Sequence, residues 1–524
     1  MKLKSATVRT FTNLHTWVGL VAGFALFVAF YAGAITVFHH ALPLWQSPAA
    51  VERPTQTIDE AQRLLDGVLQ RHPEARRHVG MLFPGAEWPQ SSIYWQDAQG
   101  TWQFASLEDM RGSPTPPQAG LGELLNELHY SLGLPIAGTW LMGIVSLLYG
   151  LALVSGVLIH LPQLAKNLFA LRPGRNLKQF WQDAHNVIGV LSLPMHVMFA
   201  VTGALLCLML VLMMALNPLV YDGKLMQALP AAMDTAPVKL VSGAGAAGGS
   251  LAMWRTRSIE AARAQGIEDF EPSYLKLANA GDRNAVVEVT GVSPGALGPL
   301  GSVALDANTG ELLATQLPGH RDANHATLAA TYALHFGEYG NALVPWLYFV
   351  LGIGGAFLFY SGNLLWIEAR RKRRQVQQGR AQVNMARATV GVCIGLCVAV
   401  SMAFVASQVL EVLAPAQVDR GIRWACFLTW GACALWAAWR PPARAARELL
   451  WLAAVATVAI PFVHGLASGW WPWRSAAAGY WSLFWIDGVA LAMAFAFAML
   501  ARATARRARN GEPNSVWADP AAAR

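Results

Sequence analysis

Histidine is the residue type in this sequence best suited to chemistry, and several of its 13 copies recur at matching places. His15 and His185 each lie near the start of a long apolar segment, whereas His129 and His335 each lie just before one. His196 lies 11 residues beyond His185. On one straight helix this spacing puts the two side chains roughly 16 Å apart and about 20° from alignment. Two stacked b-type haems need neutral imidazoles at two depths in the membrane, since imidazoles can fill both axial positions of each haem iron.

These histidines belong to an internal repeat. The phrase at 14–19 is similar to that at 184–189, and the phrase at 128–133 is similar to that at 334–340. The sequence therefore predicts two copies of helix, outer module and helix, related by a pseudo-two-fold axis along the membrane normal.

The symmetry of the repeat suggests how the histidines pair. His15 would pair with His185 at an inner haem, and His129 with His335 at an outer one. His196 has no counterpart, because Leu26 occupies the matching position. It either replaces one of the outer histidines or lines the route between the haems.

Other histidines are further candidates. His160 ends the second apolar segment and could also bind haem iron, and His39, His40 and His464 lie at or within apolar segments. A single histidine of this kind is more simply read as an interfacial or hydrogen-bonded residue, and only the repeated placement favours ligands. Asp487, an acid within the last segment, indicates a polar partner or proton handling.

The composition indicates an integral membrane protein. Of 524 residues, 54% are hydrophobic and only 13% are charged, whereas charged residues make up about 25% of a soluble domain. Eight segments are long and apolar enough to span a bilayer: 15–38, 137–160, 186–214, 342–366, 387–411, 421–439, 449–468 and 480–501. We therefore expect a mainly α, polytopic protein with a four-helix haem-binding core and a four-helix C-terminal annex.

The expected organisation has six parts. They are a first transmembrane helix (1–38), a first outer module (39–136), helices two and three (137–214), a second outer module (215–341), helix four with a basic loop (342–380), and the annex with a basic tail (381–524). The first segment is longer than a signal-peptide core and is predicted to be retained.

The net charge of +8 divides unequally between the two sides of the predicted membrane. With both termini cytoplasmic, the inner pieces hold 22 basic and 5 acidic residues, and the rest of the chain holds 17 and 26. Basic residues favour the cytoplasmic side. The charge thus predicts a topology with both termini inside and excludes nucleic acid as a partner.

Each outer stretch is predicted to be a small α+β module. A capped helix is expected at 57–69, followed by a hairpin of strands 92–95 and 101–104. In the second stretch we expect a helix at 259–265, strands at 285–290 and 302–305, and a turn between two strands at 306–313.

The quoted phrases resemble a known family. The stretch 305–312 looks like a PepSY module, and the phrases 14–20, 128–129, 181–189, 193–196 and 334–337 look like the PepSY-associated transmembrane family over about residues 1–370. That family includes inner-membrane reductases of bacterial siderophore uptake whose four-helix core carries two haems. The resemblance implies that the haem-binding set comprises His15, His129, His185, His196 and His335. The annex is additional to the minimal form, and the first module matches the PepSY pattern poorly.

These observations favour a di-haem b oxidoreductase that passes electrons outward to a periplasmic acceptor, with a ferric siderophore as the expected substrate and the lipid bilayer as its surroundings. No glycine-rich dinucleotide loop follows a strand in the cytoplasmic pieces. A separate cytoplasmic reductase or a membrane quinol must then supply the electrons. The alternatives are an iron or siderophore permease and a non-enzymatic PepSY-type regulatory membrane protein.

Overall fold

The computed structural model describes residues 4–47, 55–85, 90–107, 120–160, 177–225, 229, 233–372, 375 and 378–518. Two compact units make up the chain. The helical unit comprises Met1–Val51, Ala119–Leu208 and Leu347–Arg524, and the sheet unit comprises Glu52–Gln118 and Met209–Trp346.

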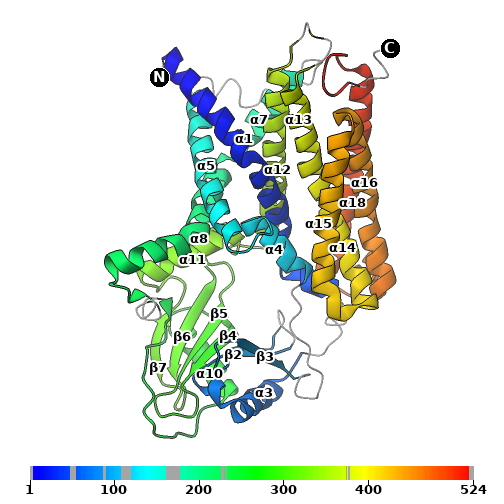
Figure 1. Ribbon diagram of the computed structural model, residues 1–524. Helices are drawn as coiled ribbons and strands as arrows, with labels where there is room; N and C mark the ends of the chain where they lie inside the picture. Colours follow the sequence, from blue (N-terminus) through cyan, green and yellow to red (C-terminus); the bar gives the residue numbers. More distant parts are fainter. Residues whose placement is uncertain are drawn as a thin grey trace. The chain divides into compact units, whose positions relative to one another are not determined.

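The helical unit consists of long apolar helices, so the protein is a membrane protein (Figure 1). Among the described residues, six helical segments are long and apolar enough to cross a bilayer. They are α1 (Ser5–Thr36), α5 (Ala137–His160), α12 (Leu343–Ala369), the run Arg380–Leu413 that contains α13 (Arg380–Thr389) and α14 (Gly395–Leu413), α16 (Pro442–Ser468) and α18 (Trp481–Asn510).

The expected third span is a broken helix. It consists of α7 (Leu177–Leu191) and α8 (Leu193–Val220), which are bent by 70° at their junction. Pro194 has no N–H for the helical ladder, and the Ser192 hydroxyl donates to the Ile188 carbonyl at 2.6 Å. The expectation that His185 and His196 share one face of a straight helix is therefore wrong, because they lie on two helices that meet at a steep angle.

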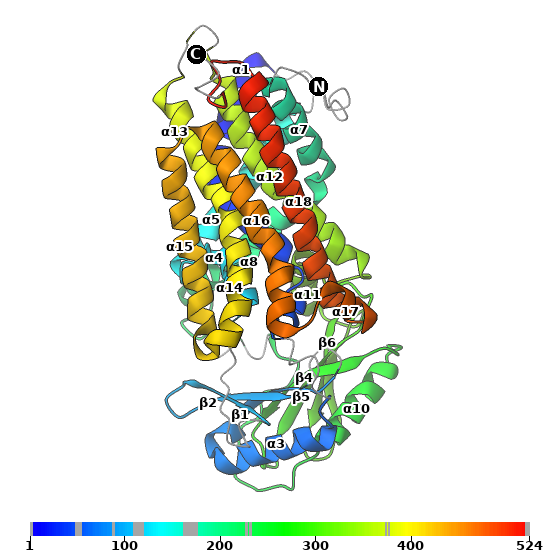
Figure 2. The ribbon, with the colours of Figure 1, turned by 90° about the vertical axis from the view of Figure 1, so that its right-hand side faces the viewer.

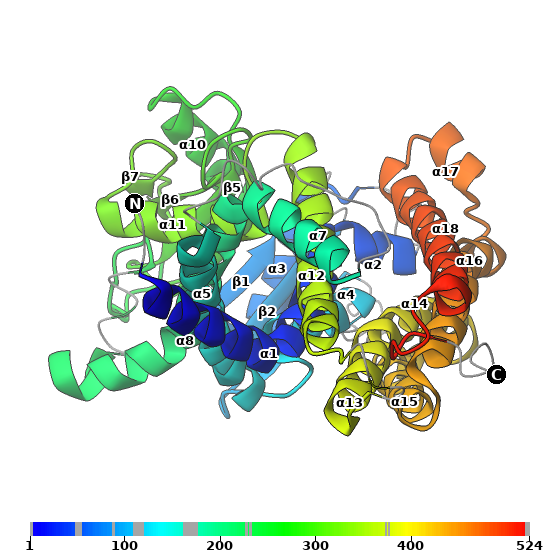
Figure 3. The ribbon, with the colours of Figure 1, turned by 90° about the horizontal axis from the view of Figure 1, so that it is seen from above.

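The annex is a compact group of helices (Figures 2 and 3). Its α14, α16 and α18 pack together, and α15 (Val418–Trp439) runs along α14. The sequence predicted α15 as a span, but it is not among the helices that are apolar enough to cross a bilayer. Its first two turns carry the charged residues Asp419, Arg420 and Arg423. Within the described residues the structure thus supports six spans, or seven with the bent pair, in place of the expected eight.

The sheet unit contains one antiparallel sheet of seven strands in the described part of the chain (Figure 1). Its order is β3 (Trp102–Ser106), β2 (Ser92–Gln96), β1 (His78–Leu82), β4 (Glu271–Ala278), β5 (Val286–Val292), β6 (Leu300–Asp306) and β7 (Leu312–Gln316). Strand β1 of the first stretch pairs with β4 of the second, with Gly80 opposite Lys276. The two stretches therefore form one continuous sheet, which corrects the expectation of two separate modules.

Two helices, α3 (Ile58–Arg71) and α10 (Leu251–Arg263), cover one face of this sheet (Figures 1 and 2). Alternate strand residues such as Val79, Ile93 and Leu275 point toward them and form the core, as the two-residue period of a strand requires. The Thr57 side chain and Glu60 form the capping box of α3, which confirms the predicted helix start.

The predicted hairpins are confirmed, whereas other details differ. Asp97 closes the β2–β3 turn by accepting from the Gln99 and Thr101 N–H groups at 3.0 and 2.8 Å. Asp306 does the same between β6 and β7 with the Asn308 N–H at 3.0 Å. Helix α10 begins eight residues before the predicted position 259, and β1 and β4 were not predicted.

Asp282 ties the chain that precedes α10 to the β4–β5 connection. Its carboxylate accepts from the N–H groups of Asn284, Ser242 and Gly243 at 2.7, 3.1 and 2.9 Å, and from the Ser242 hydroxyl at 2.8 Å. These bonds, the Asn284 N–H first among them, lower the pKa of Asp282 from 3.8 to about 2.

We therefore predict an acid-sensitive contact at Asp282. Because the folded pKa lies below the unfolded one, the stabilisation is complete above about pH 4 and is lost as the pH falls through about 2. Asp282→Asn should exchange amide hydrogens in residues 242–249 faster than the parent near neutral pH, and this difference should shrink between pH 4 and pH 2. A difference that stays constant over that range would contradict the assignment.

Candidate haem-binding site

His15, on α1, is held in place by α5. Its Nδ1 lies 2.9 Å from the Ala152 carbonyl oxygen and 3.4 Å from the Ser155 hydroxyl. Gly156 lies directly beside the ring, since a Cβ there would come within 3.1 Å of the His15 Cε1. The carbonyl, the serine and the glycine thus occupy positions i, i+3 and i+4 of one helix.

His185, on α7, is held by α12 in the same way. Its Nδ1 lies 3.1 Å from the Leu358 carbonyl oxygen and 3.2 Å from the Ser361 hydroxyl. A Cβ on Gly362 would lie 3.4 Å from the His185 Cε1. The carbonyl, serine and glycine again lie at i, i+3 and i+4. The Ser-Gly pairs in the two matching spans were a signal of this arrangement that the sequence analysis missed.

The structure brings these two histidines together. Their ring centroids are 6.2 Å apart, and the ring planes are at 83° to each other. In both rings Nδ1 is engaged by a carbonyl, and neither Nε2 makes a hydrogen bond to any described residue. A histidine oriented through Nδ1 in this manner keeps its Nε2 available for a metal.

His129 lies on a short helix, α4 (Leu121–Ser131), and contacts α1. Its Nδ1 is 2.8 Å from the Ala29 carbonyl oxygen, and a Cβ on Gly33 would lie only 2.4 Å from that nitrogen. The carbonyl at i and the glycine at i+4 repeat the pattern seen at His15 and His185. Burial lowers the pKa of His129 and favours the neutral imidazole that a metal ligand must be.

His196, on α8, is surrounded by aromatic rings. Its Nδ1 is hydrogen-bonded to the Tyr149 hydroxyl, and the ring of Phe30 lies 5.7 Å away between centroids. A Cβ on Gly355 would lie 3.2 Å from its Cε1. The side chain is buried and its Nε2 has no partner among the described residues. A buried polar atom without a partner is costly unless a bound group satisfies it.

His335 lies in the last turn of α11 (Ala323–Phe336), which belongs to the sheet unit. Its pairing with His129 stays a prediction. His160 is the last residue of α5. Four other histidines of the sheet unit make local contacts or face solvent, and two of these pair with neighbouring acids: His72 with Glu74, and His325 with Asp322.

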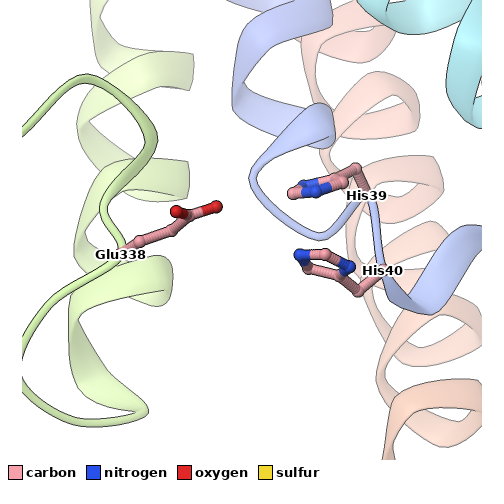
Figure 4. A group of neighbouring side chains, drawn as sticks. All are labelled: His39, His40 and Glu338. Carbon is pink, nitrogen blue, oxygen red and sulfur yellow. The ribbon is translucent and has the colours of Figure 1, made fainter. Parts of the chain in front are cut away.

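His39 and His40 follow the end of α1, and their rings lie close together with the planes tilted by 42° (Figure 4). Their ring centroids are 3.7 Å apart, and the His39 Nδ1 lies 3.2 Å from the Thr36 carbonyl oxygen. Burial and the neighbouring His39 lower the pKa of His40 to about 4. Glu338, drawn in the same figure, belongs to the sheet unit.

The His129 ring lies so close to Gly33 that a side chain at position 33 should clash with it. Gly33→Ala places a methyl group where the His129 ring now lies, so it should displace the ring and destabilise the protein by about 1–3 kcal/mol. Gly19→Ala, on the same helix, is the matched control because nothing lies within 4 Å of its new methyl group. Thermal unfolding in detergent measures both, and equal melting temperatures would refute the close contact.

Comparison with known proteins identifies the family. The model of the PepSY-associated TM region matches residues 12–369, which include all five histidines of the predicted set. An uncharacterized protein of Pseudomonas aeruginosa is 28% identical over an alignment of 318 residues, which covers 57% of this chain and 74% of that protein. The chain therefore belongs to the PepSY-associated TM region family.

Proposed function

We propose that this protein is a di-haem b oxidoreductase of the bacterial inner membrane. It passes electrons across the membrane to a periplasmic acceptor, Fe(III) in a ferric siderophore, and so releases Fe(II). The excess of basic residues on the segments assigned to the cytoplasm supports the orientation with both termini inside.

The observation that carries this proposal is the distance between the His15 and His185 rings. A ring nitrogen lies about 2.0–2.1 Å from a metal that it binds and the ring centre lies roughly 1.1 Å farther out, so two rings on opposite sides of one iron have centres about 6.3 Å apart. The centroids of His15 and His185 are 6.2 Å apart. This separation supports His15 and His185 as the two residues that would hold one haem iron.

The neighbouring helices orient these two rings through hydrogen bonds to Nδ1. The Ala152 and Leu358 carbonyls accept from Nδ1–H, which fixes the tautomer with a lone pair on Nε2 and increases the basicity of the ring. Gly156 and Gly362 leave room for each ring against the helix backbone. A haem bound by these residues would supply one-electron chemistry, with a potential set by its axial ligands and surroundings.

A second haem would draw on the other three histidines. His129 has its Nδ1 fixed by the Ala29 carbonyl, and His196 has a buried Nε2 without a partner. His335 completes the set that we propose, with His160 as a further candidate. The electrons would come from a cytoplasmic reductase or a membrane quinol, because no glycine-rich dinucleotide loop follows a strand in the sequence of the cytoplasmic pieces.

We predict that His15 and His185 serve the same haem. His15→Ala and His185→Ala should each lose one of two haems and leave an identical spectrum, measured as haem per chain and as the reduced-minus-oxidised difference. His320→Ala, in an exposed turn of the sheet unit, is the control and should keep both haems. Full haem content in either test variant would remove that residue from the ligand set.

Ferric siderophores should reoxidise the reduced protein. After dithionite reduction and removal of the excess, each Fe(III) chelate consumes one electron, so we expect up to two Fe(II) ions per chain, trapped by a ferrous-specific chelator. A haem-loaded protein that no ferric chelate reoxidises would refute the siderophore as substrate. Binding of ferric chelates by a protein without haem would support the permease alternative instead.

A further inference from the structure

We propose that the annex positions His129 by fixing both ends of α4. This inference rests on the proposed function, because it takes His129 to be a haem ligand. Helix α4 has only 11 residues, and helices this short are marginal by themselves. A ligand must be held within about 0.5 Å of its working position, so the placement of His129 has to come from contacts with other elements.

The C-terminal half of α4 is fixed by α15 of the annex. The Arg423 guanidinium forms a two-pronged ion pair with Glu127, two residues before His129, with Nη2 3.0 Å from Oε1 and Nη1 bonded to Oε2. Asp419 holds the Arg423 Nε at 3.0 Å. The ring of Phe427 lies against Gly133, where a Cβ would be 2.5 Å from its Cζ. Gly133 has a φ of +71°, so the chain turns sharply there.

The N-terminus of α4 is fixed through α2 (Ala41–Gln46). Gly120 has no side chain to cap α4, and the Gln46 Oε1 accepts from the Leu121 N–H at 2.8 Å in its place. The Gln408 side chain of α14 donates to the Trp45 and Gln46 carbonyls at 2.9 and 3.2 Å. The capping group of α4 is therefore itself held by the annex.

A buried polar chain anchors α2 further. The indole N–H of Trp45 donates to Asp487 of α18 at 2.9 Å, and the second carboxylate oxygen of Asp487 lies 2.8 Å from the His464 Nδ1 of α16. All three side chains are fully buried. Buried ionisable groups are costly and contribute little net stability, so their value here is to fix a single arrangement of α2.

The apolar side of α4 also packs in a core shared with the annex. Leu124, Leu125 and Leu128 are buried in one core cluster with annex residues such as Leu396 and Val400. The His129 ring meets α1 through the Ala29 carbonyl. The annex thus fixes the backbone of α4 while α1 fixes the ring, and a shift of α4 would move the His129 Nε2.

A double-mutant cycle on the ion pair tests this inference. Arg423→Gln and Glu127→Gln should each raise amide hydrogen exchange in residues 121–131 by about tenfold, and the double variant should add little, because both changes break the same contact. Arg423→Lys keeps one charged contact and should fall between parent and Arg423→Gln. Arg440→Gln, which breaks the annex ion pair with Glu448, is the matched control and should leave 121–131 unchanged.

The midpoint potentials of the haems provide a second measurement. They would not change if Arg423 only stabilised the fold. Arg423→Gln should shift the midpoint potential of one haem by about 59 mV and leave the potential of the other haem unchanged. For a one-electron couple, 59 mV corresponds to a tenfold change in the protein's affinity for the oxidised haem relative to the reduced haem. Unchanged exchange and potentials in Arg423→Gln, or an equal effect in Arg440→Gln, would overturn the inference. A parent protein without haem would refute the proposed function, whereas the exchange data would still decide whether the annex fixes α4.

Discussion

A buried imidazole must satisfy its N–H without water, and this constraint shapes the surroundings of three histidines in the helical unit. A helix carbonyl at position i already accepts from the N–H at i+4, and a bulky ring from another helix reaches its second lone pair most easily where the residue at i+4 has no side chain. At His15, His129 and His185 that residue is glycine, four positions after the accepting carbonyl. One local solution therefore recurs at three sites.

The internal repeat explains why the solution recurs. The first copy holds His15 of α1 on α5, and the second holds His185 of α7 on α12, with the same carbonyl, serine and glycine spacing. The sheet unit carries the repeat as well, since a helix followed by an antiparallel meander occurs twice and the copies join at β1 and β4. The annex has no counterpart within the repeat, in keeping with a supporting role.

Much of the fold follows from local signals in the sequence, and the exceptions have physical reasons. The capping box at Thr57 and the Asp97 and Asp306 turns depend on residues close in the chain, so they could be predicted. The pairing of β1 with β4 joins residues about 200 positions apart and leaves no local signal. The break at Ser192 had a visible cause in Pro194, but hydropathy alone does not detect a bend.

The candidate site was predictable in its residue types and only partly in its geometry. The recurrence of His15 and His185 indicated a pair, and their rings do lie together, whereas the supports at Ser155, Ser361 and the glycines came only from the structure. Asp487 was expected to have a polar partner, and it has two, Trp45 and His464. Side-chain partners on distant helices depend on packing, which a single sequence does not specify.

We propose above that His15 and His185 hold the same haem. The most direct measurement is the low-temperature electron paramagnetic resonance spectrum, with haem stoichiometry, of the protein purified from a haem-replete host. We expect two low-spin ferric haems per chain with bis-imidazole signals. A protein that contains no haem, or only high-spin haem with a single imidazole ligand, would contradict it.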